Sequence, residues 1–366
     1  MKILFVSITD SGILRVRSEL IDSLINKGHK VIVVTPKEKA YKELIAKGCK
    51  VYNISIQQHG KNPLADFHLF LQYKRMLQLI KPNVVLSFTT KPNVYCGIAC
   101  RLNKIPVIMN ITGMGSALGG KGMVQQLLIL LYKLACNGSN MKCIFFQNDD
   151  SKNFFKERRI GKQKLYQRIP GSGVNLERYT PQPFPNSDTI DFLFVARVMK
   201  EKGIDEYIKA AKCIRKRYPE AIFHVLGDSD KKYKDILYRE TQKGSIIYHG
   251  RVNNMVDYEM ISQCTIQPSY YPEGMSNVIL EAAASARPVI TTDHPGCREG
   301  VDNGKTGFIV PVRNVTELVK AIDKFIQLPL EMRIKMGKDG RIKMENEFDR
   351  KLVTNAYLKE IREIMK

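Results

Sequence analysis

Short hydrophobic runs alternate with longer amphipathic stretches along most of the chain. The first half predicts helices over residues 16–27 and 39–47, which end at Gly28 and Gly48. Strand-like runs are predicted at residues 3–7, 30–35, 51–54, 84–88, 106–110 and 142–147. Strands that alternate with helices in this way are typical of parallel sheets with helices on both faces.

A joint rich in proline and glycine interrupts this alternation near the middle of the chain. It covers residues 170–185 and includes Pro170-Gly171-Ser172-Gly173 and three further prolines. The alternation then restarts with a helix at 204–217 and a short strand that begins at Cys264. Further strands are predicted at 192–196, 222–226, 246–248 and 288–292.

We therefore expect an α/β protein of two Rossmann-like, doubly wound domains that face each other across a cleft. At 366 residues the chain is longer than one hydrophobic core usually supports. Residues 1–175 are expected to form the first domain and residues 176–349 the second. A final amphipathic helix over 350–366 is expected to pack back onto the first domain.

Residues 273–281 form the loop and helix start with the clearest candidate chemistry. They follow a short strand, and the carboxyl end of a parallel strand is where open α/β sheets bind nucleotides. We expect the free N–H groups of Ser276, Asn277 and Val278 to face an anionic phosphate. The carboxylate of Glu281 can accept hydrogen bonds from two ribose hydroxyls.

Arg197 and Lys202 supply the cations that a diphosphate needs. They follow the strand at 192–196 and lie five residues apart. Taken alone, Lys202 would be interpreted as a solvated loop lysine, but the later glutamates favour a phosphate contact. Glu273 has two compatible interpretations, as a contact to a sugar and as a charge at the positive end of the following helix.

Asp228-Ser229-Asp230 is a candidate metal motif, since paired carboxylates can hold a divalent ion on a diphosphate. Asp and Ser are also favoured in turns. We prefer the turn, because Arg197 and Lys202 already neutralise a diphosphate, and we expect neither a metal nor another cofactor. The six histidines show no ligand spacing.

Composition places the chain among globular proteins. Hydrophobic residues make up 44% of it and charged residues 26%. The longest apolar runs fall short of the roughly 18 residues of a spanning helix, and Asp10 and Arg15 argue against a signal peptide. The eight cysteines are scattered and suit buried, reduced thiols, so we expect a cytoplasmic protein.

The positive charge is unevenly distributed. Residues 1–180 hold 28 Lys and Arg against 10 Asp and Glu, whereas residues 181–366 hold 30 against 26. A basic half favours contact with a polyanionic surface. Basic segments interleaved with aromatic residues, as in a platform for nucleic-acid bases, are absent from this sequence. We therefore prefer the inner face of an anionic membrane over nucleic acid, with generic solubility as the plain alternative.

An apolar helix is predicted over residues 123–133. Its apolar positions nearly surround it, so we favour burial in the core over insertion into a membrane.

The order and spacing of several motifs resemble a family 4 retaining glycosyltransferase of the GT-B fold. Within that family the chain is most similar to the subgroup that builds bacterial capsule, O-antigen and lipid-linked oligosaccharides. The first-half motifs are Gly60-Lys61-Asn62-Pro63, Thr90-Lys91-Pro92, Ile144 to Asn148 and Ile169 to Asn175. The second-half motifs are Phe194 to Arg197, Lys202-Gly203-Ile204, the 273–281 stretch, Pro288-Val289-Ile290 and Pro295 to Glu299.

The resemblance implies a transfer of sugar from a nucleotide-sugar, such as a UDP-sugar, to a lipid-linked or saccharide acceptor. It implies that Arg197 and Lys202 hold the diphosphate, that Glu281 holds the ribose and that Glu273 faces the sugar. The remaining assignments are a donor set of Gly12, Arg251, Gly274, Met275, Ser276, Asn277 and Val278, and an acceptor set of Arg17, Lys91 and Thr112.

One departure from the family concerns Thr112, where many members have a histidine that contacts the donor sugar. A threonine donates one hydrogen bond but carries no proton charge near neutrality, so a histidine-based role is excluded here. The resemblance implies a front-face reaction without a protein nucleophile. The choice of sugar and acceptor is expected to depend on loops near residues 57–66, 89–95 and 112–122.

Two other classes of protein stay open from the sequence. A nucleotide-sugar epimerase of similar architecture would need acid and base residues in its cleft, and the sequence offers no clear pair. A nucleic-acid-binding protein is suggested by the net charge of +22 alone.

Overall fold

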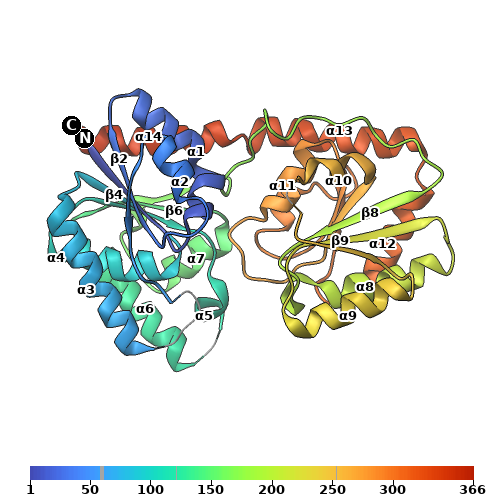
Figure 1. Ribbon diagram of the computed structural model, residues 1–366, viewed down its shortest axis with the longest axis horizontal. Helices are drawn as coiled ribbons and strands as arrows, with labels where there is room; N and C mark the ends of the chain where they lie inside the picture. The colour runs from blue at the N-terminus through green and yellow to red at the C-terminus, as the bar shows by residue number, and fades with distance from the viewer. Residues whose placement is uncertain (58–61, 121, 253) are drawn as a thin grey trace. The chain divides into compact units, whose positions relative to one another are not determined.

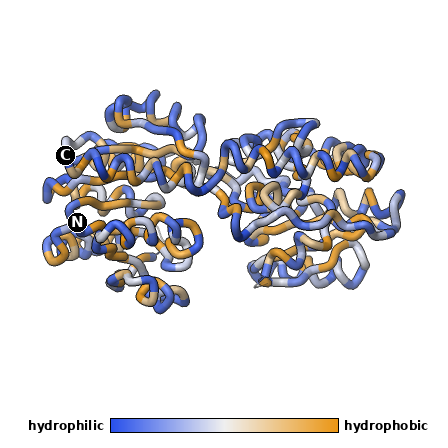
Figure 2. The backbone as a smooth tube through the Cα atoms, turned by 90° about the horizontal axis from the view of Figure 1, so that it is seen from above, coloured by the Kyte–Doolittle hydropathy of each residue, from blue (hydrophilic) through white to orange (hydrophobic). Residues whose placement is uncertain are grey.

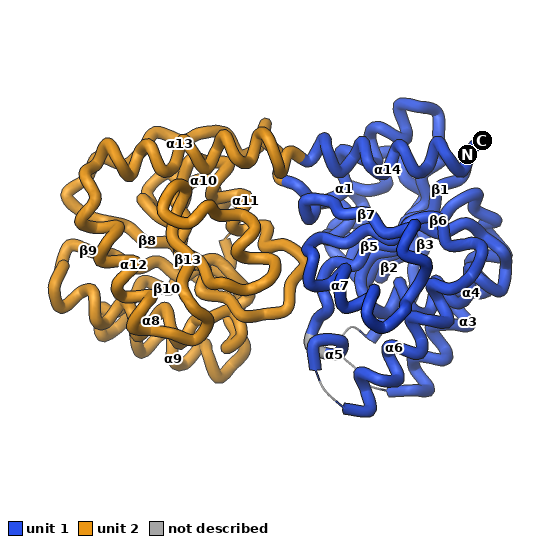
Figure 3. The backbone as a smooth tube through the Cα atoms, turned by 180° about the vertical axis from the view of Figure 1, so that it is seen from behind, with its two compact units in different colours: residues 1–173, 350–366 blue, residues 174–349 orange. Residues whose placement is uncertain are grey.

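The computed structural model describes the chain except residues 58–61, 121 and 253. It divides into two compact units (Figure 3). Unit 1 consists of residues 1–173 and 350–366, and unit 2 consists of residues 174–349. The first unit ends at residue 173, whereas the sequence interpretation placed the domain boundary after residue 175.

Unit 1 contains, in its described residues, a sheet of seven strands in the order β3-β2-β1-β4-β5-β6-β7. Figure 1 labels β2, β4 and β6 of this sheet. Each neighbouring pair is parallel. The strands are β1 (Lys2–Val6), β2 (Lys30–Thr35), β3 (Lys50–Asn53), β4 (Val84–Phe88), β5 (Val107–Ile111), β6 (Met141–Phe146) and β7 (Tyr166–Arg168).

Helices cover this sheet. In chain order they are α1 (Asp10–Asn26), α2 (Tyr41–Ala46), α3 (Pro63–Ile80), the π-helix η1 (Pro92–Cys96), α4 (Gly97–Leu102), α5 (Gly115–Gly119), α6 (Met123–Cys136), α7 (Asp149–Glu157), the 3₁₀ turn η2 (Gln163–Leu165) and α14 (Arg350–Met365). Helix α14 packs against the first unit, where it contacts α1 and β6. Its Tyr357 hydroxyl accepts a hydrogen bond of 2.6 Å from Asn110 Nδ2, and Arg350 pairs with Glu19 of α1 at 2.9 Å.

Unit 2 contains a parallel sheet of six strands among its described residues, in the order β10-β9-β8-β11-β12-β13. The strands are β8 (Ile190–Val195), β9 (Ala221–Leu226), β10 (Ile247–Gly250), β11 (Cys264–Gln267), β12 (Val289–Thr292) and β13 (Gly307–Val310). The helices are η3 (Lys200–Lys202), α8 (Ile204–Arg215), α9 (Lys231–Gln242), α10 (Val256–Ile261), α11 (Asn277–Ala284), η4 (Arg298–Gly300), α12 (Val315–Gln327) and α13 (Leu330–Glu347).

The strands and the helices that cover them share the hydrophobic core of each unit, and Figure 2 shows how apolar and polar segments alternate along the backbone. β4 is buried at every position, as is β5, because helices cover both faces of a parallel sheet. This explains why these strands appear in the sequence as continuous apolar runs rather than as an alternation.

Helix α1 begins at Asp10, six residues before the start predicted from the sequence. The Thr9 side chain caps the helix by accepting a hydrogen bond of 3.2 Å from the Gly12 N–H, a signal that the sequence interpretation missed. Gly12 therefore lies in the first turn of a helix. Its N–H already has an acceptor in the Thr9 side chain, and the assignment of Gly12 to the donor set stays a prediction.

Candidate functional site

In each sheet the strand order reverses at one position, the switch point, and candidate residues follow the strands on either side of it. In unit 2 the chain runs outward through β8, β9 and β10, then returns to place β11 on the other side of β8. In unit 1 the corresponding point lies between β1 and β4. Loops that follow the two strands at such a point diverge, which leaves room for a ligand at the carboxyl end of the sheet.

In unit 2 this point is charged. The loop after β8 carries Lys202, and the loop after β11 carries Glu273. The Lys202 ammonium contacts Glu273 Oε1, and the two side chains are 16% and 15% exposed. Lys202 Nζ also lies 5.1 Å from the centre of the Tyr271 ring. Lys202 is thus an ordered, largely buried cation and not a solvated loop lysine.

Burial alters the chemistry of this lysine. It lowers the pKa of Lys202 to about 8, and the nearby charge of Arg197 acts in the same direction. The contacting Glu273 carboxylate favours the ammonium, so Lys202 is charged at neutral pH. A desolvated ammonium held in one position interacts with a phosphate more strongly than one in bulk water.

Gly203 fixes the loop that carries Lys202. Its backbone is left-handed, with φ of 81°, and a Cβ at this position would collide with the carbonyl oxygen of Pro268 at the end of β11. A hydrogen bond of 2.9 Å from the Tyr270 N–H to the Glu201 carbonyl joins the same two loops. The close approach that glycine permits therefore brings Lys202 to Glu273.

The N-terminus of α11 differs in part from the prediction. Ser276 occupies the N-cap position of this helix without a capping hydrogen bond from its side chain. Its N–H donates to the Gly296 carbonyl at 2.7 Å, so it is not free to face a phosphate. Asn277 and Val278 are the first two helical residues, whose N–H groups have no acceptor within the helix. The Asn277 Oδ1 atom is buried and has no hydrogen-bond partner. Two of the three predicted N–H groups thus remain candidates.

The rest of this segment is largely buried. Met275 is 6% exposed and Glu281 is 5% exposed. Gly274 lies beside Gly296. A Cβ added to Gly296 would lie 3.0 Å from the carbonyl oxygen of Gly274. Glu281 lies near a second buried acid, Glu259, whose pKa is raised to about 7, mainly by burial. Sequence reasoning missed Glu259, which lies 22 residues before Glu281 in α10.

Arg197 and Arg251 are exposed. Arg197 follows β8 and donates a hydrogen bond of 3.4 Å to Met199 Sδ. Arg251 follows β10 and lies 3.3 Å from Asp228, with 67% and 63% of their side chains exposed. Both arginines therefore lie at the carboxyl end of the unit 2 sheet, where they can reorient toward a ligand.

The Asp228-Ser229-Asp230 stretch links β9 to α9 without forming a regular turn, and Ser229 makes a parallel β-bridge with Val198. Asp230 caps α9 by accepting a hydrogen bond of 2.9 Å from the Tyr233 N–H. Across the part of the chain that the structure describes, no group of three or more His, Cys, Asp and Glu side chains is arranged to hold a metal ion.

In unit 1, the residues predicted for the acceptor lie in different environments. Lys91, just after β4, pairs with Asp66 at 2.7 Å, and Tyr95 donates a hydrogen bond of 3.0 Å to the same carboxylate. Thr112 directly follows β5 and is partly buried. Arg17 instead lies in the core, 3% exposed.

Arg17 stacks within the core of unit 1. Its guanidinium lies 5.0 Å from the Phe88 ring centre and 5.5 Å from that of Tyr357, and burial lowers its pKa. A side chain enclosed in this way has little surface for an acceptor. The prediction that Arg17 binds the acceptor finds no support in this position, because helix α14 covers it.

Helix α6 corrects another expectation. Only one of its faces is buried, through Ile129, Tyr132, Ala135 and Cys136. The opposite face carries the exposed side chains of Met123, Val124, Leu127, Leu130 and Leu134, which are 45% to 89% exposed. The prediction of a core helix is therefore half wrong, since an almost fully apolar helix has a second apolar face that this unit leaves uncovered.

A cavity of about 640 Å³ lies among α3, η1, α4, α5 and α6. Its wall is mostly hydrocarbon and includes Phe67, Phe70, Val94, Ile98, Leu127 and Leu131. Thr90, Lys91 and Asp66 form its polar part. It draws on all three loops expected to set acceptor choice, although residues 58–61 and 121 of those loops, and with them Gly60 and Lys61 of the first motif, fall outside the described residues.

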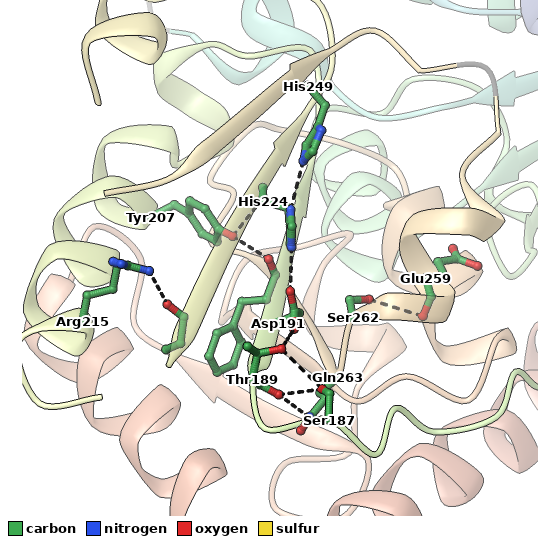
Figure 4. A network of polar contacts seen from close by, with 12 residues as sticks. Ser187, Thr189, Asp191, Tyr207, Arg215, His224, His249, Glu259, Ser262 and Gln263 are labelled. Carbon is green, nitrogen blue, oxygen red and sulfur yellow. Dashed lines mark hydrogen bonds and ion pairs between the residues drawn. The ribbon is translucent and has the colours of Figure 1, made fainter. Parts of the chain in front are cut away.

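A buried polar chain in unit 2 was also missed (Figure 4). His224 Nε2 lies 2.8 Å from Asp191 Oδ1, and His224 Nδ1 lies 2.9 Å from His249 Nε2. Thr189 donates to the other Asp191 oxygen at 2.7 Å. The three central residues come from β8, β9 and β10, so only the pairing of these strands reveals the chain. Its groups satisfy one another, which is the usual arrangement of buried polar side chains.

In the part of the chain that the structure describes, no helix is both long enough and apolar enough to cross a bilayer.

The two units match two family models. Residues 177–343 match a model described as glycosyl transferases group 1, and residues 2–148 match one described as glycosyl transferase 4-like. Together these models cover most of both units.

Relatives that match most of the chain support the same grouping. The chain is 24% identical to the N,N'-diacetylbacillosaminyl-diphospho-undecaprenol alpha-1,3-N-acetylgalactosaminyltransferase of Campylobacter jejuni, over 98% of both chains. It is 26% identical to the capsular polysaccharide biosynthesis glycosyltransferase CapM of Staphylococcus aureus, over 81% of this chain and 84% of that one. Among solved structures, Anabaena HepE in complex with UDP-glucose is similar with a TM-score of 0.81 and 18% identity, over 99% of this chain and 100% of the other.

Proposed function

The chain belongs to the glycosyltransferases of the GT-B fold, and from this premise we propose its substrates and the roles of its residues. The donor is a UDP-sugar, bound by unit 2. The acceptor is a hydroxyl of a lipid-linked saccharide in the synthesis of a bacterial surface polysaccharide, bound by unit 1. The observation that carries the donor half is the buried contact of Lys202 with Glu273 at the switch point of the unit 2 sheet.

Three features of the donor site support this proposal. Lys202 is a desolvated cation in contact with Glu273, which precedes the N-terminus of α11 by four residues. Such a combination stabilises negative charge that develops on a leaving diphosphate. Arg197 lies on the same loop and adds a second, movable cation. Glu273 then faces the transferred sugar, and Glu281 accepts hydrogen bonds from the ribose.

The reaction proceeds with retention of configuration in this proposal. The leaving phosphate oxygen accepts the proton of the acceptor hydroxyl on the same face of the sugar, so no protein nucleophile is assigned. Lys202 and Arg197 keep that oxygen in place while charge accumulates on it.

The relatives support the choice of substrates. HepE was solved with UDP-glucose, and the Campylobacter jejuni enzyme is named for an undecaprenyl-linked acceptor. Both relatives reported above are named glycosyltransferases, which favours transfer over the epimerase and nucleic-acid alternatives.

The first unit is proposed to dock on the anionic inner face of the cell membrane, where a lipid-linked acceptor resides. Its excess of basic residues supports electrostatic docking, and the exposed apolar face of α6 supports contact with lipid. The protein is then a peripheral one on the cytoplasmic side.

A binding screen tests the donor. UDP- and GDP-sugars are added to the purified protein, and a UDP-sugar should raise the unfolding temperature as the ratio of its concentration to Kd grows. Lys202→Ala should weaken this stabilisation, whereas Lys200→Ala, an exposed lysine of the same turn, should retain it in full. A folded protein that no nucleotide-sugar stabilises would contradict the proposal.

A product assay separates transfer from epimerisation. The stabilising nucleotide-sugar is incubated with the protein alone, and then with a lipid-linked saccharide extract. A transferase leaves the sugar unchanged without acceptor and releases UDP with it. Conversion of the sugar in the absence of acceptor would instead establish an epimerase.

A further inference from the structure

We propose that the cavity among α3, η1, α4 and α6 binds the hydrocarbon chain of the acceptor's phosphorylated lipid. The proposal deepens the function given above and rests on it, because it identifies the part of unit 1 that holds the lipid of a lipid-linked acceptor. The enzyme then recognises the carrier chain as well as the saccharide.

The wall of the cavity suits a flexible hydrocarbon. Its volume of about 640 Å³ is in the range of sites that enclose small organic ligands. Phe67 and Phe70 contribute from α3, and Leu127 and Leu131 from α6. Leu127 is 58% exposed and Phe67 is 60% exposed, so the apolar lining continues onto the surface. Exposed apolar side chains that extend a cavity are typical of a binding groove.

The polar part of the wall is already satisfied. Asp66 accepts a salt bridge from Lys91 at 2.7 Å and a hydrogen bond from Tyr95 at 3.0 Å. This leaves no isolated acid that would repel a phosphate. Lys91 follows β4 at the switch point of unit 1, where sheet topology favours a ligand. The cavity therefore lies beside the residue predicted to bind the acceptor.

The charge around the cavity favours an anionic partner. Residues 63–136 hold eight Lys or Arg and one acid, Asp66. Lys74 is exposed and shares a face of α3 with Phe67 and Phe70, since residues three, four and seven positions apart lie together on a helix. A chain with an apolar tail and a phosphate head matches an apolar cavity that has Lys91 in its wall and the exposed Lys74 on the neighbouring face of α3, and we refer to these two lysines as its basic rim.

The same charge argues against a second copy of this chain as occupant. The full sequence carries a net charge of +22, so two copies would bring like charges together at this basic rim. Ordinary membrane lipids share the chemistry of tail and phosphate, and the experiment must separate them from the acceptor's single-chain carrier.

Binding of farnesyl phosphate tests the proposal without knowledge of the saccharide. The probe is titrated into the full chain below its micelle concentration and compared with isopentenyl phosphate, which has the same head and a shorter chain. Farnesyl phosphate should bind at least about tenfold more tightly, because the added carbons become buried. Equal binding of the two would overturn the proposal.

Two matched variants locate the site. Leu127→Gln lies in the cavity wall, whereas Leu130→Gln lies on the same helix, is similarly exposed at 54% and is not part of the wall. Leu127→Gln should weaken farnesyl phosphate by about fivefold, and Leu130→Gln should leave it unchanged. Equal losses would show binding to the whole apolar face and would overturn a cavity site.

A competition distinguishes the carrier from bulk lipid. Soluble dihexanoyl phosphatidylglycerol should fail to displace farnesyl phosphate, and displacement at similar concentrations would overturn the assignment to the acceptor lipid. UDP-sugar stabilisation, measured in parallel, reports on unit 2. If farnesyl phosphate binds but no UDP-sugar stabilises the protein, the proposed donor is rejected. If a UDP-sugar stabilises the protein but farnesyl phosphate does not bind, the lipid site alone is rejected.

Discussion

The two switch points share one topology and differ in chemistry. In unit 1, β1 lies between β2, the next strand in the chain, and β4, which the chain forms later on the other side. In unit 2, β8 lies between β9 and β11 in the same way. The loops after β4, β8 and β11 carry candidate residues. In unit 2 these loops hold a buried ion pair, Lys202 with Glu273, next to a helix N-terminus. In unit 1 the loop after β4 leads to Lys91 and an apolar cavity.

This difference separates what the fold provides from what the loops provide. The parallel sheet supplies a position where two loops diverge, and it does so twice in one chain. The side chains on those loops then decide whether the position suits a diphosphate or a lipid chain. One architecture can therefore hold two unlike substrates, because the side chains of the loops can differ while the strands that carry them stay the same.

The largest effect is expected from removal of the charge at the unit 2 switch point. Lys202→Ala should lower turnover by about 10² to 10³, by analogy with the loss of one preorganised donor of charge stabilisation. Steady-state kinetics with the donor identified by the screen measure it. Lys200→Ala is the control, and near-normal turnover in a folded Lys202→Ala protein would remove Lys202 from the site.

The pKa of Lys202 gives a second way to sharpen the comparison. Because that pKa is about 8, the ammonium is lost as the pH rises above 8, and donor affinity should fall by about tenfold per pH unit there. Calorimetric titration of UDP between pH 7 and 9.5 checks this. The slope should vanish in Lys202→Ala, and a flat profile in the wild-type protein would show that another cation dominates.

Much of the fold could be predicted from the sequence, because apolar strand runs and glycine stops are local signals. Lys202 and Glu273 were predicted to share a site because both follow strands, and their side chains are in contact in the structure. Other features depend on tertiary contacts that no spacing encodes. The Ser276 N–H is used by Gly296, Arg17 is covered by α14, and half of α6 faces outward.

Membrane docking tests the unit 1 side of the comparison. Lys74→Glu with Arg75→Glu changes an exposed basic pair on α3, and Lys231→Glu with Lys232→Glu makes the same change of charge in unit 2. Each basic residue near an anionic leaflet contributes about 1 kcal/mol, so the α3 pair should weaken vesicle binding by about tenfold or more. The α9 pair should have a smaller effect.

Sedimentation with vesicles of increasing anionic lipid content measures this binding, which should also fall steeply with salt. Equal losses in the two double variants would indicate that net charge alone, and not the basic face of unit 1, drives the association. A protein that ignores anionic vesicles at low salt would reject membrane docking but leave the sugar transfer intact.

The smallest effect is expected at the segment between β9 and α9 in unit 2, which carries Asp228 and Asp230. If Lys202 and Arg197 neutralise the diphosphate, turnover should survive excess chelator and the change Asp228→Asn. Asp230→Asn is a matched control, because asparagine caps a helix about as well as aspartate and so preserves the start of α9. Activity that chelator abolishes and manganese or magnesium restores would mean that the carboxylates, and not the lysine, complete the donor site. A bound metal ion, and not Lys202, would then supply the positive charge that distinguishes the switch point of unit 2 from the apolar one of unit 1.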